Sequence, residues 1–406
     1  MMSTHEPIGY TEALKLTLDN ICPLQQETIP LMEATDRVVA MDLPSLVDSP
    51  SVDASLKDGY AIHAEEITDA SPENPVYLKI IGLASPGHPF NGVLLSGTAV
   101  RILTGAKIPD GANAVVSEEF TSVKGDVVVV LNNADRGRNV LTRGSDVTKG
   151  ELLTVKGTRL SPGFYGILVA SGYSDIPVYK RPEVAIIATG DEVIMPGKPL
   201  PEGKLYASNL ATLNSWCNRY GIRTVMDIAK DNPGDILNRL SQAVKEQDVI
   251  LTSGGAWTGD RDFVVQMLEE LGWRQFFHRI RIGPGKGVGF GILENKPVFI
   301  LPGGPPSNLL AFLEIALPAL HKLSGLSCYG LSQCRVRLEK SLTVRDKGWT
   351  QFIFGKLIDG NDFPIFRPIE LKSRLQSMAL AEAVITVPEG IEKIERQSIL
   401  TAQSLL

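Results

Sequence analysis

The apolar run Pro182-Glu183-Val184-Ala185-Ile186-Ile187-Ala188-Thr189 stops abruptly at Gly190-Asp191-Glu192. A continuous run of this kind is typical of a strand that is buried on both faces, as in a parallel sheet. Comparable runs occur at 248–253 and 297–301, and each of them ends in glycine or proline. The sequence therefore predicts several buried strands in the middle of the chain.

Helical patterns separate these strands. One covers 210–220 and is closed by Gly221 in the usual C′ position, and a second begins at Asp231-Asn232-Pro233 with proline in its first turn. A third, 307–320, follows the last strand. Alternation of strands and helices indicates crossover connections, so we expect an α/β domain built on a mostly parallel sheet.

In such a sheet the ligand binds beyond the carboxyl ends of the strands. Here these ends contain glycines, which let a ligand approach the backbone, and helix starts, whose N–H groups favour phosphate. Carboxylates beside a phosphate suggest a bridging divalent cation or a hydroxyl-bearing ligand. The alternative is a set of tight turns with solvated acids. The segments concerned are Thr189-Gly190-Asp191-Glu192, Asp227 to Asp231, Ser253-Gly254-Gly255 and Pro302-Gly303-Gly304.

Composition limits the function classes. The net charge of −6 argues against a nucleic-acid binder, whose affinity depends on clustered Lys and Arg, although it does not exclude a small anionic ligand. The four cysteines form no CxxC pair, which predicts neither a zinc site nor disulfides and indicates a reducing compartment. Residues 1–20 lack the apolar core of a signal peptide, and Glu314 and Pro318 interrupt the most apolar helix. We therefore expect a soluble, cytoplasmic protein that does not enter a membrane.

A chain of 406 residues is too long for one hydrophobic core. The chain from Ile8 to about Leu43 looks helical, and Ala34 to Ala40 continue a helix-compatible pattern until Pro44. Residues 45–144 are rich in Pro, Gly and short strand patterns, and a helix starting at Ser161-Pro162 is expected to pack back on the N-terminal helix. After Gly325 the pattern alternates, as in a small antiparallel sheet or barrel. The predicted parts are a helical linker domain (1–44 and 145–181), a β-rich second domain (45–144), an α/β domain (182–326) and a C-terminal β domain (327–406).

Several motifs, in this order along the chain, resemble those of a known family. They are Ser55-Leu56-Lys57-Asp58-Gly59-Tyr60-Ala61, Arg101-Ile102-Leu103-Thr104-Gly105-Ala106, the stretch from Ile108 to Val116, Arg143-Gly144-Ser145-Asp146, Thr189-Gly190-Asp191-Glu192, and Ser253-Gly254-Gly255 to Asp262. Their ordered combination resembles the MoeA-type molybdopterin molybdenumtransferases, which include the gephyrin E domain. The resemblance covers nearly the whole chain.

The resemblance implies a fold and a reaction. It implies the same four-part, multidomain α/β architecture and an elongated homodimer, in which the α/β domain of one subunit faces the second domain of the other. The reaction that it implies inserts molybdate into adenylylated molybdopterin, with Mg²⁺ as the divalent cation, and releases AMP. Such a site must compensate several negative charges at once.

The resemblance also implies site residues. Catalytic roles fall to Asp58, Thr104, Glu192, Asp231 and Asp262, of which Glu192, Asp231 and Asp262 are the expected metal ligands. Taken alone, Asp58 would be read as a turn former, and Arg143 with Asp146 as a surface pair. Binding of the pterin nucleotide falls to Arg143, Asp146, Thr189, Gly190, Asp191, Ser253, Gly254, Gly255, Lys286, Pro302 and Gly303.

Several positions depart from the family pattern. Lys57 stands where Met is usual, Trp257 where Ser is usual, and Gly283 where a lysine is usual, so that Lys286 or Arg281 would have to supply that charge. The turn Gly304-Pro305-Pro306 replaces Gly-Asn-Pro, and Glu382-Ala383-Val384 also departs from the pattern. Two alternatives therefore stay open: a pterin-binding carrier or scaffold with weak or no transferase activity, and a tungstate-preferring variant. A nicotinamide-dependent enzyme is disfavoured, because the stretch from Gly254 to Gly259 lacks the G-x-G-x-x-G spacing.

Overall fold

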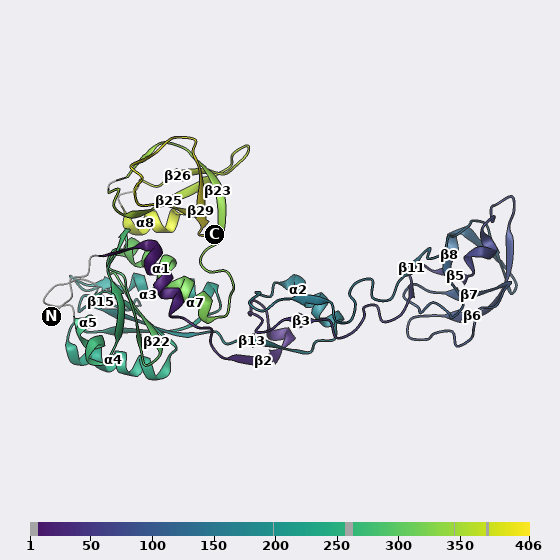
Figure 1. Ribbon diagram of the computed structural model, residues 1–406, viewed down its shortest axis with the longest axis horizontal. Helices are drawn as coiled ribbons and strands as arrows, with labels where there is room; N and C mark the ends of the chain where they lie inside the picture. Colours follow the sequence, from purple (N-terminus) through teal and green to yellow (C-terminus); the bar gives the residue numbers. More distant parts are fainter. Residues whose placement is uncertain (1–6, 198, 256–262, 345, 371–372) are drawn as a thin grey trace.

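The computed structural model describes residues 7–197, 199–255, 263–344, 346–370 and 373–406. The chain is elongated (Figure 1): the β-rich second domain lies at one end, the linker domain in the middle, and the α/β and C-terminal domains together at the other end. The predicted multidomain α/β architecture is confirmed. Among the helices of the described residues, none has the length and apolar character that a membrane crossing requires.

The α/β domain is built on a mixed sheet with the strand order β17-β14-β18-β22-β21-β19. The first four strands pair in parallel, whereas β21 and β19 are antiparallel. The strands are β17 (Arg223–Ala229), β14 (Glu183–Thr189), β18 (Val249–Ser253), β22 (Lys296–Leu301), β21 (Gly289–Leu293) and β19 (Arg274–His278), and the short β15 (Val193–Ile194) and β16 (Leu205–Tyr206) pair beside the sheet.

Burial of β14 on both faces explains its continuous apolar sequence. Val184 and Ile186 point into the core shared with α3, whereas Ala185 and Ile187 point into the core shared with α4. Alternate residues of a strand face opposite sides, so a strand between two helical layers needs apolar residues at every position. The helices are α3 (Ser208–Arg219), α4 (Pro233–Glu246), α5 (Phe263–Glu270), α6 (Pro305–Ala311), the π-helical turn η4 (Phe312–Ala316) and α7 (Leu317–Leu323).

The predicted helix ends agree with the structure. Gly221 follows α3 with φ of +66°, a value that favours glycine. The Asn232 side chain caps α4 by accepting a hydrogen bond from the N–H of Asp235.

The N-terminal helix differs from the prediction. Helix α1 (Tyr10–Asp19) places Ala13 in the α/β core rather than in the linker domain, and Lys322 Nζ donates to Leu18 O at 2.7 Å. Strand β1 (Ile8–Gly9) pairs with β20 (Ile280–Gly283). Residues 34–40 are not helical, and α2 (Pro162–Ala170) packs on Leu31 and Val39 instead of α1. The expected packing of α2 on the N-terminal helix was therefore wrong, because the apolar stripe of α1 is buried against α7.

The linker and second domains are mostly β structure. In the linker domain β13 (Asp175–Tyr179) pairs with β2 (Gln26–Pro30), β12 (Leu152–Thr154) pairs with β3 (Leu43–Pro44), and the 3₁₀ turn η1 is Leu31–Glu33. The second domain has a six-stranded sheet of β8 (Ala114–Ser117), β5 (Gly59–Ile62), β7 (Thr98–Ile102), β6 (Val76–Ala84), β10 (Val127–Val130) and β9 (Thr121–Lys124), together with β4 (Ala54–Ser55), β11 (Val140–Leu141), η2 (Ala64–Ile67) and η3 (Glu118–Phe120).

The C-terminal domain is a small closed barrel. Strands β25, β26, β23, β29 and β27 pair in a ring, which β25 and β27 close. The sequence predicted an antiparallel sheet or barrel, but the β23–β26 pair is parallel, so the sheet is mixed. Its elements are β23 (Gln333–Leu338), β24 (Leu342–Thr343), β25 (Thr350–Ile358), β26 (Ile365–Pro368), α8 (Arg374–Leu380), β27 (Ala383–Val387), β28 (Lys393–Ile394) and β29 (Ile399–Ser404).

A buried carboxyl group joins three parts of this end of the molecule. Glu314, in η4, is 1% exposed and accepts hydrogen bonds from Tyr10 Oη at 2.7 Å and Gln403 Nε2 at 3.3 Å. Burial raises the pKa of Glu314 to about 7. The Glu314 Oε1 and Gln403 Oε1 atoms are both buried and have no hydrogen-bond partner among the described residues, which fits a carboxyl group that carries a proton.

We predict that Glu314→Gln reduces the pH dependence of stability. The folded chain binds this proton more tightly than the unfolded chain, so the stabilisation is complete below pH 4.5 and is lost as the pH rises through about 7. The free energy of unfolding that this proton contributes at low pH, and that is lost at high pH, is about 3 kcal/mol. The measurement is the melting temperature of each protein at pH 5 and at pH 8. Between these two pH values the melting temperature of the wild type should fall further than that of the variant. An equal loss in both proteins would contradict the raised pKa.

Candidate active site

A cavity of about 1110 Å³ opens at the carboxyl ends of β14, β18 and β22. It is the place that the parallel sheet predicted for a ligand. Ten of the expected residues line it: Thr189, Gly190, Glu192, Asp231, Ser253, Gly254, Gly255, Lys286, Pro302 and Gly303. Other lining residues were not anticipated, among them Asn209, Ser307, Ser373, Arg374 and Leu375.

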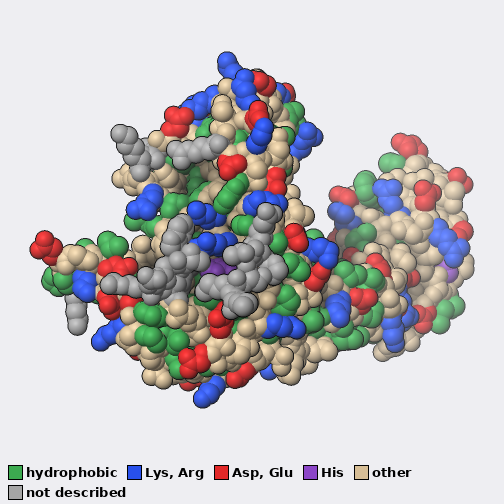
Figure 2. All heavy atoms as spheres, turned by 60° about the vertical axis from the view of Figure 1, so that its left-hand side comes forward, with side chains coloured by type: hydrophobic (Ala, Val, Ile, Leu, Met, Phe, Trp, Pro, Cys, Tyr) green, Lys and Arg blue, Asp and Glu red, His purple; other side chains and the backbone are tan. Residues whose placement is uncertain are grey.

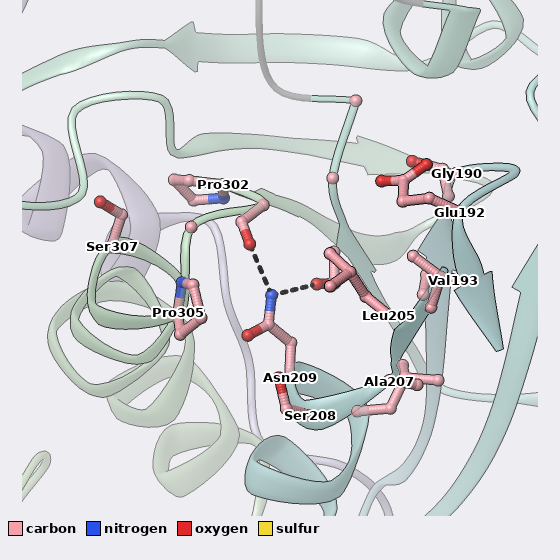
Figure 3. Close-up of a pocket in the computed structure, with 18 of the residues that line it drawn as sticks. Gly190, Glu192, Val193, Leu205, Ala207, Ser208, Asn209, Pro302, Pro305 and Ser307 are labelled. Carbon is pink, nitrogen blue, oxygen red and sulfur yellow. Dashed lines mark hydrogen bonds between the residues drawn. The ribbon is translucent and has the colours of Figure 1, made fainter. Parts of the chain in front are cut away.

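In the turn that follows β14, the Glu192 side chain lies close to the backbone of Gly190. Figure 3 shows the Glu192 carboxylate folded back toward Gly190 at the rim of the cavity. Gly190 has φ of +141°, and a Cβ atom there would lie 2.6 Å from Glu192 Oε2. The backbone conformation therefore favours glycine, and any Cβ atom here would have to displace the Glu192 carboxylate.

Glycines also bring two neighbouring turns close together. A Cβ atom on Gly254 would lie 2.9 Å from Thr189 Oγ1, and one on Gly303 would lie 3.7 Å from Gly254 Cα. Gly254 N donates to Leu301 O at 3.0 Å, which ties the end of β18 to the end of β22. The glycines thus leave backbone accessible to a ligand at these turns, as a phosphate-binding site requires.

Cations approach the cavity from two directions. Lys286 lies in the loop between β20 and β21, and Arg374 begins α8 of the C-terminal domain, which packs on α6. Figure 2 shows Lys and Arg side chains gathered where the two domains meet. Arg281 is directed elsewhere, since its guanidinium contacts Pro7 O and forms a 3.2 Å ion pair with Glu389. Of the two candidates for the missing lysine charge, the structure favours Lys286.

Two of the expected acids share the cavity. Glu192 and Asp231 both line it, whereas Asp191 does not and accepts a hydrogen bond from the N–H of Asp231 at 3.3 Å. Asp262 and Trp257 lie outside the described residues. No group of three or more metal-ligating side chains occurs within the described part of the chain.

The remaining expected residues lie outside the α/β domain: Asp58, Thr104 and Arg143 in the second domain, and Asp146 just beyond it in the linker domain. Asp58 accepts hydrogen bonds from Thr104 N at 2.7 Å and Thr104 Oγ1 at 2.8 Å, and the backbone bond is the main cause of its lowered pKa. Arg143 forms an ion pair with Asp48, while Asp146 N donates to Ser49 O at 3.0 Å. None of these four residues lines the cavity. Asp58 and Thr104 adjoin β5 and β7, which lie at the far end of the chain (Figure 1), so one chain does not bring them to the cavity.

Two of the unanticipated residues lacked a signal in the sequence. Asn209 is in the first turn of α3, but the strand before it, β16, pairs with β15 beside the main sheet, so the strand-end rule gave no signal for this residue. Arg374 had no signal either, because only the docking of the C-terminal domain brings α8 to the cavity.

Comparisons with known proteins agree with this geometry. Residues 8–172 match the MoeA N-terminal region (domain I and II), and residues 185–322 match a probable molybdopterin binding domain. A molybdopterin molybdenumtransferase of Haemophilus influenzae is 32% identical over 75% of this chain and 74% of its own, and one of Nostoc sp. is 33% identical over 75% and 71%. A crystal structure of a molybdopterin biosynthesis MoeA protein from Pyrococcus horikoshii has a TM-score of 0.86 and 30% identity, and covers 98% of this chain and 99% of that one.

The chain therefore belongs to the MoeA family of molybdopterin molybdenumtransferases.

We predict that Gly190→Ala displaces the Glu192 carboxylate. The Cβ atom would overlap both carboxylate oxygens, and the positive φ adds strain of about 1–2 kcal/mol. Gly197→Ala is the matched control, because Gly197 also has positive φ, +110°, but has no atom within 4 Å of the added Cβ. Calorimetric titration with AMP should show altered binding for Gly190→Ala alone. Equal effects of the two variants would mean that strain, and not the collision, is responsible.

Proposed function

We propose that this chain inserts molybdate into adenylylated molybdopterin and releases AMP, yielding molybdenum cofactor. The observation that carries the proposal is the cavity itself, which the glycine turns at Ser253-Gly254-Gly255 and Gly303 line together with Lys286 and Glu192. A volume of about 1110 Å³ suits a nucleotide conjugate rather than a small metabolite. Membership of the family supports the same reaction.

The charges of the cavity suit this substrate. A pterin adenylate brings a pyrophosphate, and molybdate brings a further dianion, so the site must compensate several negative charges. Lys286 and Arg374 supply positive charge, and the glycine turns let the phosphates approach the backbone closely. AMP leaves when water attacks one phosphorus of the phosphoanhydride: a new P–O bond forms as the bridging P–O bond breaks, so that AMP and molybdopterin each keep one phosphate. Oriented donors stabilise the negative charge that develops on the departing phosphate.

A magnesium ion fits the carboxylates. Mg²⁺ is usually bound by one or two carboxylates together with substrate phosphates, and Glu192 and Asp231 line the same cavity. These two residues and Asp262 would hold it. When bound, the ion neutralises phosphate charge and polarises the bond to be broken. The carboxylates would fix the position of the cation and would thereby orient the phosphates that it contacts.

The homodimer is part of the proposal. Asp58 and Thr104 form a hydrogen-bonded pair that is exposed and remote from the cavity of its own chain. A twofold arrangement of two elongated chains would bring the second domain of one chain to the α/β domain of the other. A cytoplasmic location is supported by the four cysteines, all of which are free thiols.

The test is AMP release from adenylylated molybdopterin, measured with Mg²⁺ and molybdate and with each omitted. Glu192→Gln should lower the rate about 100-fold or more, because it removes a charge that acts on the reacting phosphates. Its melting temperature should stay close to that of the wild type, since Glu192 is exposed. Binding of the adenylate without release by the wild type would select a carrier role instead, and faster release with tungstate would select the tungstate-preferring variant.

The dimer predicts complementation between two inactive variants. Asp58→Asn removes the carboxylate of the second domain, and Glu192→Gln removes that of the α/β domain. In a mixed dimer one of the two sites combines an intact Asp58 with an intact Glu192. After random exchange of subunits we expect roughly a quarter of wild-type activity. No recovery in a sample shown by light scattering to contain mixed dimers would exclude a site shared between subunits.

A further inference from the structure

Two asparagine side chains converge on one serine at the floor of the cavity. Asn209, from the start of α3, donates from Nδ2 to Ser253 Oγ at 3.1 Å. Asn308, from α6, donates from Nδ2 to the same oxygen at 3.0 Å. Figure 3 shows the Asn209 amide between its two oxygen partners. Asn308 is 1% exposed and Ser253 is 5% exposed, so solvent water has little access to the hydrogen bond between them.

Backbone carbonyls determine which way both amides face. Asn209 Nδ2 also donates to Gly303 O at 2.9 Å, and Asn308 Nδ2 also donates to Pro302 O at 2.9 Å. A carbonyl oxygen can only accept, so the NH₂ group and not the amide oxygen must lie on this side of each asparagine. Both asparagines therefore present donors to Ser253.

The serine hydroxyl is left with one possible role. A hydroxyl oxygen has two acceptor positions and one proton, and the two asparagines occupy both acceptor positions. Within the described residues, no acceptor receives a hydrogen bond from Ser253 Oγ. Ser253 also lines the cavity. Its proton is therefore available to a ligand there, and a ligand group that can only donate would find no acceptor on it.

We propose that Asn209 and Asn308 are positioning residues that make Ser253 an obligate hydrogen-bond donor to a phosphate oxygen of the nucleotide. This inference rests on the proposed function and deepens it. The two asparagines make the Ser253 hydroxyl selective for a hydrogen-bond acceptor without adding charge. This selectivity complements Lys286, whose charge attracts anions of any shape. It also links the Pro302-Gly303 turn to Ser253, since the same amides hold both.

The test compares AMP with adenosine, which lacks the phosphate, by calorimetric titration of the full chain. Ser253→Ala should weaken AMP binding about 10- to 100-fold, as loss of a hydrogen bond to a charged group does. Asn308→Leu and Asn209→Ala should each weaken it by a smaller factor, about 3- to 10-fold, because the hydroxyl can then turn away. Adenosine affinity should stay within about twofold in all three.

Double variants separate positioning from a merely structural role. In the Ser253→Ala background, Asn308→Leu and Asn209→Ala should have no further effect on AMP affinity, since the hydroxyl that they orient is gone. Asn214→Ala is the matched control: Asn214 lies on α3 as Asn209 does, and accepts a hydrogen bond from Thr224 away from the cavity. It should leave AMP affinity unchanged.

Three outcomes would overturn the inference. One is additive loss in the double variants, another is equal loss for adenosine and AMP, and the third is unchanged AMP affinity in both asparagine variants. If Asn308→Leu fails to fold, Asn209→Ala decides, because Asn209 is only half-buried. A wild-type chain that binds no AMP would overturn both the inference and the proposed function. AMP binding that depends on the asparagines, without release of AMP from the adenylate, would support the inference and defeat only the transferase.

Discussion

The parallel pairing of β14, β18 and β22 is the constraint on which the rest of this end of the molecule depends. Their registers place Thr189, Ser253 and the Leu301-Pro302 junction at one edge of the sheet. Two apolar layers hold the strands from opposite faces, which prevents any slip that would turn core residues outward. The turns that follow these three strands, beginning at Gly190, Gly254 and Pro302, are thereby brought to the same cavity. The glycines then let the neighbouring turns approach one another, leaving backbone and a few polar side chains as its floor.

The cavity combines opposite charges drawn from distant parts of the chain. Glu192 and Asp231 come from the α/β domain, whereas Arg374 comes from the C-terminal barrel. Contacts of α1 and Glu314 with both domains keep that barrel in place: Tyr10 and Gln403 both donate to the same oxygen, Oε2, of the buried Glu314 carboxyl group. A site that handles a polyanion with a cation needs both signs of charge at close range, and rigid domain docking holds them there before the ligand arrives.

Sequence patterns identified most of this arrangement where local rules apply. The strand at 182–189, the Asn232 cap and the glycine after α3 were all predictable, because burial on both faces, capping and positive φ each demand particular residue types. Residues 34–40 were misjudged as helical, since a helix-compatible pattern there meets neighbours that form strands instead. The partner of α1 was also misjudged, because an amphipathic stripe shows that a helix is buried but not against which domain.

By itself the sequence determined that the chain contains an α/β unit, that its strand ends carry glycines and acids, and that the motifs occur in the order of the MoeA family. Those features are local or ordered along the chain, so they can be read without coordinates. Only the tertiary structure decided that Arg374 faces the cavity, that Asp58 and Thr104 lie far from it in their own chain, and that two asparagines meet at Ser253. These depend on domain docking and on hydrogen-bond geometry between residues up to a hundred positions apart, and no spacing rule encodes either.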